Sequence, residues 1–408
     1  MIKVAQVTVD RSYGTKQFLP GLASVPSWKC NVLHSLLVTG YLTTPPRHRP
    51  LSLSTYWAWL RYGAAISRRH RGLRLRLGWT DLDPHQKTIL SDDFGLGFPC
   101  HFLAERHGFE DFADTGYLLD SIFKTSVTYK KKPKRGPAKS PDLIAVDSAW
   151  QLHVLECKGT QSTRKYLRTA VADGQAQKRN LKPKIPGFFK SCMVGGIFVP
   201  QWRSKETAEL LFIDPEPDPR IRQLETLPPE TVASAVRRQS LAKGLAMCGL
   251  WGSATAVDGG DLVAEEIARV LQIESGEIAF NGYVEGDLGW RKSVEYRATD
   301  NTPEERGAFI TELTIDVPRS LTDFIKRTVS SDGRLPSGEV DAWIKQQLQM
   351  RREENRLRKS AQPVGTRADN ELPSAWTFDQ DADSDVQTSA SATLPSGLRF
   401  ALSLRRIG

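Results

Sequence analysis

The alternation of apolar and polar positions in the middle of the chain predicts a β-hairpin. Residues 143–146 (LIAV) and 151–158 (QLHVLECK) are two strand-like runs, and the short segment DSAW between them is the expected turn. Three charged residues lie in or beside these runs, namely Asp142, Glu156 and Lys158. A hairpin that only fills a core has no use for such charges, so they are the first candidates for function.

The patterns around the hairpin predict a mixed α/β sheet with helices packed on it. A helix is expected to end near Gly108, and residues 114–130 are expected to run into a strand. After the hairpin, residues 160–181 carry a weakly apolar helical stripe. The apolar runs at 192–200 and 209–214 are short enough to be central strands.

Patterns nearer the two ends predict further elements. Residues 73–79 (LRLRLGW) alternate with period two and predict a half-buried strand with Arg74 and Arg76 on its open face. Towards the C-terminus the predicted helices cover 230–252, 262–272 and 340–360, and the predicted strands cover 277–284 and 308–317.

These changes in pattern divide the chain into five expected parts. They are an N-terminal accessory region (1–85), an α/β core (86–215), a mainly helical C-terminal region (216–360), an acidic flexible linker (361–395) and a terminal strand (396–408) that docks back on the body. The linker prediction rests on a polar composition with few large apolar residues.

Composition is that of an ordinary folded protein. The 408 residues are 39% hydrophobic and 25% charged, and no apolar run approaches the ~18–20 residues that a membrane span needs. The first residues lack the apolar core of a secretory signal. Five scattered cysteines without a CxxC pair are typical of reduced thiols, so a cytoplasmic location without a membrane segment is expected.

The charge is unevenly distributed. The chain carries a net charge of +9, yet residues 121–190 alone contain 16 Lys and Arg against 4 Asp and Glu. The densest basic run consists of Lys130, Lys131, Lys132, Lys134, Arg135 and Lys139. A solvated surface would explain such a run by itself, but this one directly precedes the hairpin. Its position favours a polyanion partner, and a phosphate backbone is the commonest polyanion.

The hairpin charges suggest a metal site. Residues two apart in a strand share a face, so Glu156 and Lys158 point together, while Leu155 and Cys157 point to the opposite, packed face. Asp142 opens the neighbouring strand within side-chain reach of Glu156. Two close carboxylates repel each other unless a cation such as Mg²⁺ lies between them. An exposed Glu156–Lys158 ion pair is the simpler alternative, but it does not account for Asp142.

These residues resemble the PD-(D/E)XK motif of the restriction-endonuclease-like nuclease superfamily, with Pro141-Asp142 followed by Glu156-Cys157-Lys158. The resemblance implies a mixed central sheet flanked by helices. It also implies Asp142, Glu156 and the backbone carbonyl of Cys157 as Mg²⁺ ligands, with Mn²⁺ able to substitute. Lys158 would orient the attacking water and stabilise charge on phosphorus.

The resemblance covers roughly residues 86–215 and implies further site residues. Many members add an acid from a helix before the motif, and Asp93 is the nearest match, with Asp92 next to it. Many also carry a glutamine on the helix after the motif. Here Gln177, followed by Lys178 as a nucleic-acid contact, is preferred to Gln175.

The leading hypothesis is therefore a Mg²⁺-dependent DNA endonuclease that acts in restriction or defence against foreign DNA, as a homodimer or with partner subunits. One alternative is a nucleic-acid-binding or scaffold subunit that keeps the fold without cleaving. Another is a nuclease of recombination, repair or transposition. Core or surface roles are favoured over catalysis for His85 and His101, and core packing over base stacking for Trp57 and Trp59.

Overall fold

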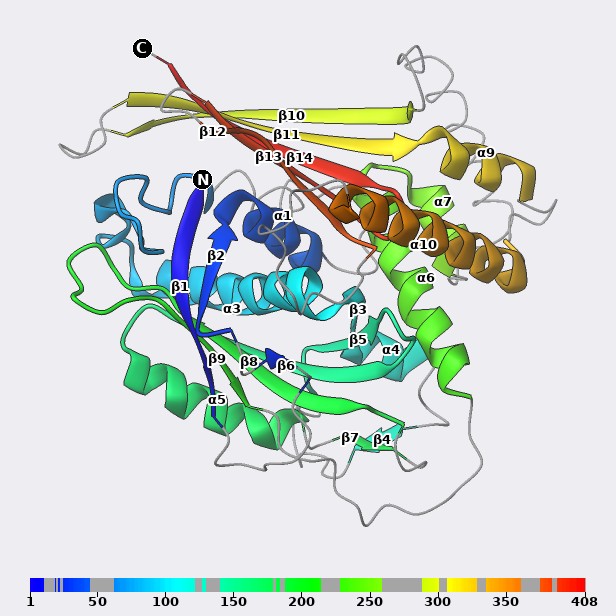
Figure 1. Cartoon of the computed structure of the whole chain (residues 1–408), viewed down its shortest axis with the longest axis horizontal. Coiled ribbons are helices and arrows are strands. Elements are labelled where there is room, and N and C mark those ends of the chain that lie inside the picture. Colours follow the sequence, from blue (N-terminus) through cyan, green and yellow to red (C-terminus); the bar gives the residue numbers. More distant parts are fainter. Residues whose placement is uncertain are drawn as a thin grey trace.

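The computed structural model is drawn in Figure 1, whose element labels are used below. It describes residues 1–10, 19, 21–22, 25–44, 62–121, 127–129, 140–178, 181–183, 188–213, 228–258, 288–300, 307–328, 335–360, 375–383 and 387–407. These residues form two large β-sheets with helices packed between them and on an outer face.

A seven-stranded mixed sheet contains the predicted hairpin. Its strands, in spatial order, are β2 (Ser27–Asn31), β1 (Ile2–Val9), β9 (Glu209–Ile213), β8 (Ser191–Phe198), β6 (Leu152–Thr160), β5 (Leu143–Asp147) and β3 (Phe109–Asp114). The pairs β1–β9 and β6–β8 are parallel, whereas the other neighbours are antiparallel. The mixed α/β class, the hairpin and the two central strands are thereby confirmed.

Helices cover both faces of this sheet (Figure 1). The helix α3 (Pro84–His107) packs on one face, and α5 (Arg164–Lys178) packs on the other. Leu167 and Val171 of α5 are buried against the sheet, which confirms the predicted apolar stripe. The expectation of one packed face beside the hairpin is wrong, because the face that carries Glu156 is also covered.

The helix α3 has a cap at each end. The side chain of Asp83 accepts hydrogen bonds from the backbone nitrogens of His85 and Gln86 at 2.9 and 3.1 Å, and Pro84 occupies the first turn. At the other end Gly108 adopts a φ of 67°, a left-handed conformation that suits glycine. The predicted end of the helix near Gly108 is confirmed.

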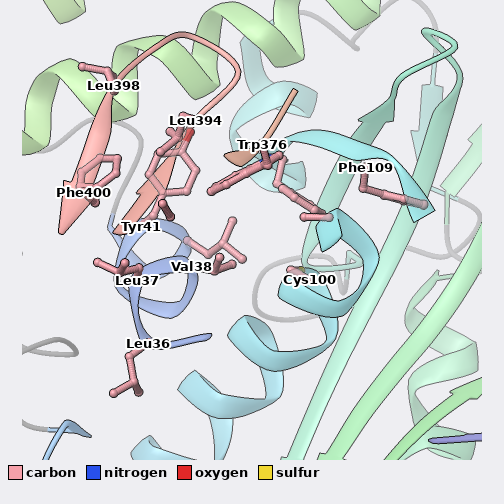
Figure 2. Close-up of a cluster of buried hydrophobic side chains, with 14 of the residues drawn as sticks. Leu36, Leu37, Val38, Tyr41, Cys100, Phe109, Trp376, Leu394, Leu398 and Phe400 are labelled. Carbon is pink, nitrogen blue, oxygen red and sulfur yellow. The ribbon is translucent and has the colours of Figure 1, made fainter. Parts of the chain in front are cut away.

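A five-stranded antiparallel sheet forms a second layer. Its order is β10 (Leu288–Asp300), β11 (Gly307–Pro318), β14 (Arg399–Ile407), β13 (Gln387–Thr393) and β12 (Thr377–Asp383). The helix α1 (Val32–Thr43) lies between this sheet and α3. Figure 2 shows Leu37 and Tyr41 of α1 beside Phe400 of β14. One continuous apolar core therefore spans both sheets.

Several shorter or peripheral elements complete the described structure. They are the 3-10 turn η3 (Leu77–Trp79), α4 (Thr115–Ser121), the paired strands β4 (Val127–Tyr129) and β7 (Leu181–Pro183), and the helices α6 (Pro229–Met247), α7 (Trp251–Asp258), α9 (Arg319–Thr328) and α10 (Ser337–Ser360). The helix predicted at 340–360 and the strand predicted at 308–317 are confirmed. The helix predicted at 230–252 is confirmed only as far as Met247, because Gly249 adopts a φ of 86° and a separate helix, α7, begins at Trp251. The predictions for 262–272 and 277–284 lie outside the described residues. Within the described ranges, no helix combines the length and apolar character needed to cross a membrane.

A buried ion cluster joins the C-terminal helices to the first sheet. Arg237 of α6 donates to Asp111 at 2.6 Å and to Glu110 at 2.9 Å, both on β3. Arg352 of α10 also donates to Glu110 at 2.6 Å. Because buried charges are costly unless paired, these contacts fix α6 and α10 against β3.

Three predictions differ from the structure. The described residues within 1–85 do not form a separate region, since β1 and β2 are strands of the main sheet. The segment expected as a linker contains β12 and β13, and residues such as Ala390 and Ala392 of β13 are buried against the body. Arg74 and Arg76 do not lie on an open strand face: Arg76 is buried, and Arg74 donates to the carbonyl of Trp202 at 2.9 Å.

Candidate active site

The turn of the hairpin fixes how its two strands pair. The carboxylate of Asp147 accepts hydrogen bonds from the backbone nitrogens of Ala149 at 2.9 Å and Gln151 at 2.8 Å. In the resulting register Leu143 lies opposite Leu155. Continuing the register by one position places Asp142 opposite Glu156, as the sequence predicted.

Asp142, Glu156 and Lys158 form one contiguous group. The backbone nitrogen of Cys157 donates to Asp142 Oδ2 at 2.7 Å. The ammonium of Lys158 pairs with Glu156 Oε1. The second oxygen of Glu156 is buried and accepts no hydrogen bond from any described residue. Glu156 thus offers a buried oxygen that a ligand could use.

The electrostatics of this group match two carboxylates held together. Burial and the nearby charge of Asp142 raise the pKa of Glu156 to about 8. Burial also raises the pKa of Asp142, against the opposing effect of the Cys157 hydrogen bond. Burial acts to lower the pKa of Lys158, but Glu156 and Asp142 together outweigh it and the pKa is raised. Such shifts are expected where like charges await a cation.

The group lies where β6 extends beyond β5. Within the described residues, β5 pairs with β6 only as far as Leu155, whereas β8 pairs with β6 from His153 to Thr160. The edge of β6 from Glu156 onward is therefore not paired with β5, and residues from both faces of the sheet can approach it there. We call this place the β5–β6 fork.

Both covering helices approach closely at the fork. On one face, a Cβ added to Gly95 of α3 would lie 2.5 Å from the backbone nitrogen of Gly159. On the other face, a Cβ added to Gly174 of α5 would lie 3.1 Å from Glu156 Cγ and 3.3 Å from Lys158 Cε. The small size of these glycines lets α3 and α5 enclose the fork.

The helix α3 brings an acid to the fork, and it is Asp92. Burial raises the pKa of Asp92 against the opposing charge of Lys158, and the charge of Asp92 adds to the raised pKa of Asp142. Asp93, the preferred residue from the sequence, instead accepts a hydrogen bond from the hydroxyl of Tyr62 at 2.5 Å. Consecutive helix positions point ~100° apart, so only one of the two acids can face the fork.

Sequence reasoning missed Asp114. It ends β3 next to the start of β5, and its charge raises the pKa of Asp142. The next residue, Thr115, donates its backbone N–H to the carbonyl of Asp142 at 3.1 Å. Asp114 also accepts a hydrogen bond from the backbone nitrogen of Tyr117 at 2.8 Å, a capping role that its sequence context could have indicated.

The other residues that the sequence suggested for the site lie in the last turn of α5, outside the described residues, or in α3. Gln177 and Lys178 lie in the last turn of α5, but the structure describes only their backbone and not their side chains. Two groups of candidates lie outside the described residues. They are the basic run (Lys130, Lys131, Lys132, Lys134, Arg135 and Lys139) and the tryptophans Trp57 and Trp59. His85 is exposed on the first turn of α3, and His101 is buried with its Nδ1 2.8 Å from Ser35 Oγ.

The thiol of Cys157 lies on the packed face opposite Glu156, as predicted, where it meets Cys100 of α3. A hydrogen bond with Cys100 and burial together raise the pKa of the Cys157 thiol well above its usual value. Only the backbone of Cys157 is therefore directed at the carboxylates, through the N–H that binds Asp142.

The described residues at the fork supply oxygen ligands for a divalent cation but do not form a complete set of protein ligands. Asp142 and Glu156 supply carboxylate oxygens, which Mg²⁺ prefers, and one of these oxygens is buried without a partner. In the described part of the chain, however, no group of three or more His, Cys, Asp or Glu side chains is arranged as a ready metal site. Mg²⁺ tolerates such a set, because it usually keeps several waters and binds through one or two carboxylates.

Comparison with known proteins gave no relatives: no family model, no curated protein and no solved structure matches this chain.

Proposed function

We propose that this chain is a Mg²⁺-dependent endonuclease that hydrolyses DNA phosphodiester bonds at the β5–β6 fork. The observation that carries the proposal is the buried, unpartnered oxygen of Glu156 between the charges of Asp142 and Lys158. The pattern of these residues in the sequence, which resembles the PD-(D/E)XK motif, supports the same chemistry.

Each residue has a distinct task in the proposed reaction. Asp142 and Glu156 would hold Mg²⁺, or Mn²⁺ in its place, and the cation would supply Lewis-acid stabilisation of charge on the phosphate. Lys158, kept charged by Glu156, would orient a water molecule and stabilise negative charge that develops on phosphorus. Asp92 would add negative charge from α3. Restriction or defence against foreign DNA, in a homodimer or with partner subunits, is the proposed setting.

The test is a plasmid-nicking assay with Mg²⁺ and with EDTA. The wild type is expected to nick with Mg²⁺ and to stop with EDTA. Asp142→Ala and Lys158→Ala are expected to lower the rate by at least about 100-fold, the usual loss when a group that stabilises transition-state charge is removed. Lys29→Ala is the matched control, because Lys29 is an exposed lysine on β2 at the far edge of the same sheet. Equal nicking by Lys158→Ala and the wild type would refute the assignment.

A non-cleaving nucleic-acid-binding subunit is the second candidate. The observation that favours it is the lack of a ready three-ligand metal group among the described residues. Tight DNA binding without Mg²⁺-dependent nicking would support this alternative over the enzyme.

A further inference from the structure

The first two turns of α5 carry basic residues and an exposed tyrosine that helix stability does not account for. Its first two turns contain Arg164, Lys165 and Arg168, and its first turn contains no acidic residue. Tyr166, between these cations, is 57% exposed. Cations at a helix N-terminus oppose the helix dipole, which favours acids there. Helix stability is therefore not the reason for this composition.

Arg164 and Arg168 attach α5 to the sheet, whereas Lys165 and Tyr166 make no such contact with any described residue. Arg168 donates to the buried Glu209 of β9 at 3.0 Å, and Arg164 donates to the carbonyl of Thr207 at 3.0 Å. These contacts attach α5 to the sheet. The side chains of Lys165 and Tyr166 are exposed, and within the described residues neither forms a hydrogen bond or an ion pair. Both are free to meet a ligand.

The helical periodicity of α5, which packs on β6 and β8 (Figure 1), relates Tyr166 to the β5–β6 fork. Arg168 points towards β9, and a residue two positions earlier lies ~200° around the helix. Tyr166 is thus on the opposite side of α5, which is the side of β6 in the strand order β9-β8-β6-β5. Gly174, where α5 meets Glu156 and Lys158, is eight residues further on, a distance of ~12 Å along the helix axis.

We propose that Tyr166 is a stacking platform for an unpaired base, with Lys165 beside it as a contact for the phosphate backbone. The inference rests on the proposed function and specifies its substrate: single-stranded or locally unpaired nucleic acid, whose strand runs along α5 to the fork. An exposed aromatic ring next to cations is the arrangement by which proteins hold single strands. A closed duplex does not present a free base face to such a ring.

The test measures binding in EDTA, so that cleavage plays no part. Fluorescence anisotropy would be recorded with a labelled oligothymidine of about 20 nucleotides, which exceeds the usual site size. Tyr166→Ala is expected to weaken binding about tenfold, and Tyr166→Phe to retain it, because the ring is what stacks. Lys165→Ala is expected to lower the salt slope of log K by about 0.7, the value for one single-strand phosphate contact.

Tyr296→Ala is the matched control. Tyr296 is 48% exposed on β10 of the second sheet, so its loss is expected to leave binding unchanged. An RNA oligonucleotide of the same length and a DNA duplex complete the comparison, and the duplex is expected to bind equally to the wild type and Tyr166→Ala. Wild-type affinity in Tyr166→Ala, or no binding of any oligonucleotide by the wild type, would overturn the platform.

Failure of this inference differs from failure of the proposed function. Oligonucleotide binding that depends on Tyr166, without Mg²⁺-dependent cleavage of either the plasmid or the oligonucleotide, would support the platform and refute the nuclease. Nicking that depends on Lys158, with unchanged oligonucleotide binding in Tyr166→Ala, would support the nuclease and refute the platform.

Discussion

At the scale of single residues, Asp92 and Asp93 show how one helix position separates a candidate site residue from a structural one. Both acids follow the same serine on α3. Asp93 is held by the hydroxyl of Tyr62 at 2.5 Å, whereas Asp92 is electrostatically coupled to Asp142 and Lys158. A motif alone does not distinguish the two positions, because the difference arises from the rotation of α3 against the sheet.

The matched pair Asp92→Asn and Asp93→Asn tests this assignment. Asp92→Asn is expected to slow Mg²⁺-dependent nicking by about 10- to 100-fold, the usual effect of altering a group that supports metal ligands. Asp93→Asn is expected to leave nicking unchanged but to lower the free energy of unfolding by about 1–3 kcal/mol, since it weakens a hydrogen bond to a charged group. Rates and denaturant unfolding would be measured on both. Loss of activity in Asp93→Asn alone would reverse the assignment.

The buried histidine His34 predicts an acid-sensitive stability. Burial lowers its pKa to about 4, below the unfolded value of about 6.5. A lowered pKa means that the folded state resists protonation. The stability contributed by neutral His34 is therefore complete above pH ~6.5 and is lost as the pH falls towards ~4.

Urea unfolding at pH 7.5, 6.0 and 5.0 would measure this effect. The free energy of unfolding of the wild type is expected to fall with pH, and His34 contributes up to about 1.4 kcal/mol per pH unit. His34→Gln removes the titrating group and is expected to show a flatter dependence. His101 contributes in the same direction, because burial also lowers its pKa. An identical pH dependence in His34→Gln and the wild type would exclude the role of His34.

At the scale of elements, the contact between α3 and β6 depends on two glycines. A Cβ on Gly159 would lie 1.7 Å from the carbonyl oxygen of Ser91, and one on Gly95 would lie 2.5 Å from the Gly159 nitrogen. Because backbone atoms cannot move aside as a flexible side chain can, the helix would have to shift away from the strand. That shift would separate Asp92 from Lys158.

Gly159→Ala is therefore expected to lower the free energy of unfolding by about 3 kcal/mol or more, the upper part of the range for overpacking. The matched control is Gly338→Ala in the first turn of α10, where a Cβ would meet no atom within 4 Å. That change is expected to raise stability by about 0.5–1 kcal/mol through helix propensity and reduced freedom of the unfolded chain. Denaturant unfolding measures both, and equal stability of the two variants would contradict the close approach.

The predictable elements were those whose partners are near in sequence. The hairpin could be read from its two apolar runs and turn, and the end of α3 from Gly108. The strands β12 and β13 could not be recognised, because their polar residues resemble a linker and their burial depends on distant α1.

At the scale of the whole molecule, α1 is enclosed by elements from both ends of the chain. Every residue from Val32 to Leu42 is buried. The helix lies against α3 on one side and against β13 and β14 on the other, and Figure 2 shows this junction around Tyr41 and Phe400. A helix that is apolar all around needs such enclosure. The second sheet is therefore part of the folding unit.

Truncation after residue 374 tests this conclusion. It removes β12, β13 and the central strand β14, and so exposes the apolar surface of α1. The shortened chain is expected to lose cooperative unfolding and to bind the dye ANS, as proteins with exposed cores do. If residues 375–407 were only a flexible tail, the truncated protein would unfold in one transition at the wild-type midpoint, and that result would contradict the structure.

The sequence by itself determined the α/β class, the hairpin register and the meeting of Asp142, Glu156 and Lys158. These follow from strand alternation and a tight turn, which act over a few residues. Only the tertiary structure decided which acid of α3 faces the fork, that both faces of the sheet are covered, and that the C-terminal strands enclose α1. Those outcomes depend on packing between segments that are far apart in the chain. A local sequence pattern does not predict which distant segment a residue will contact.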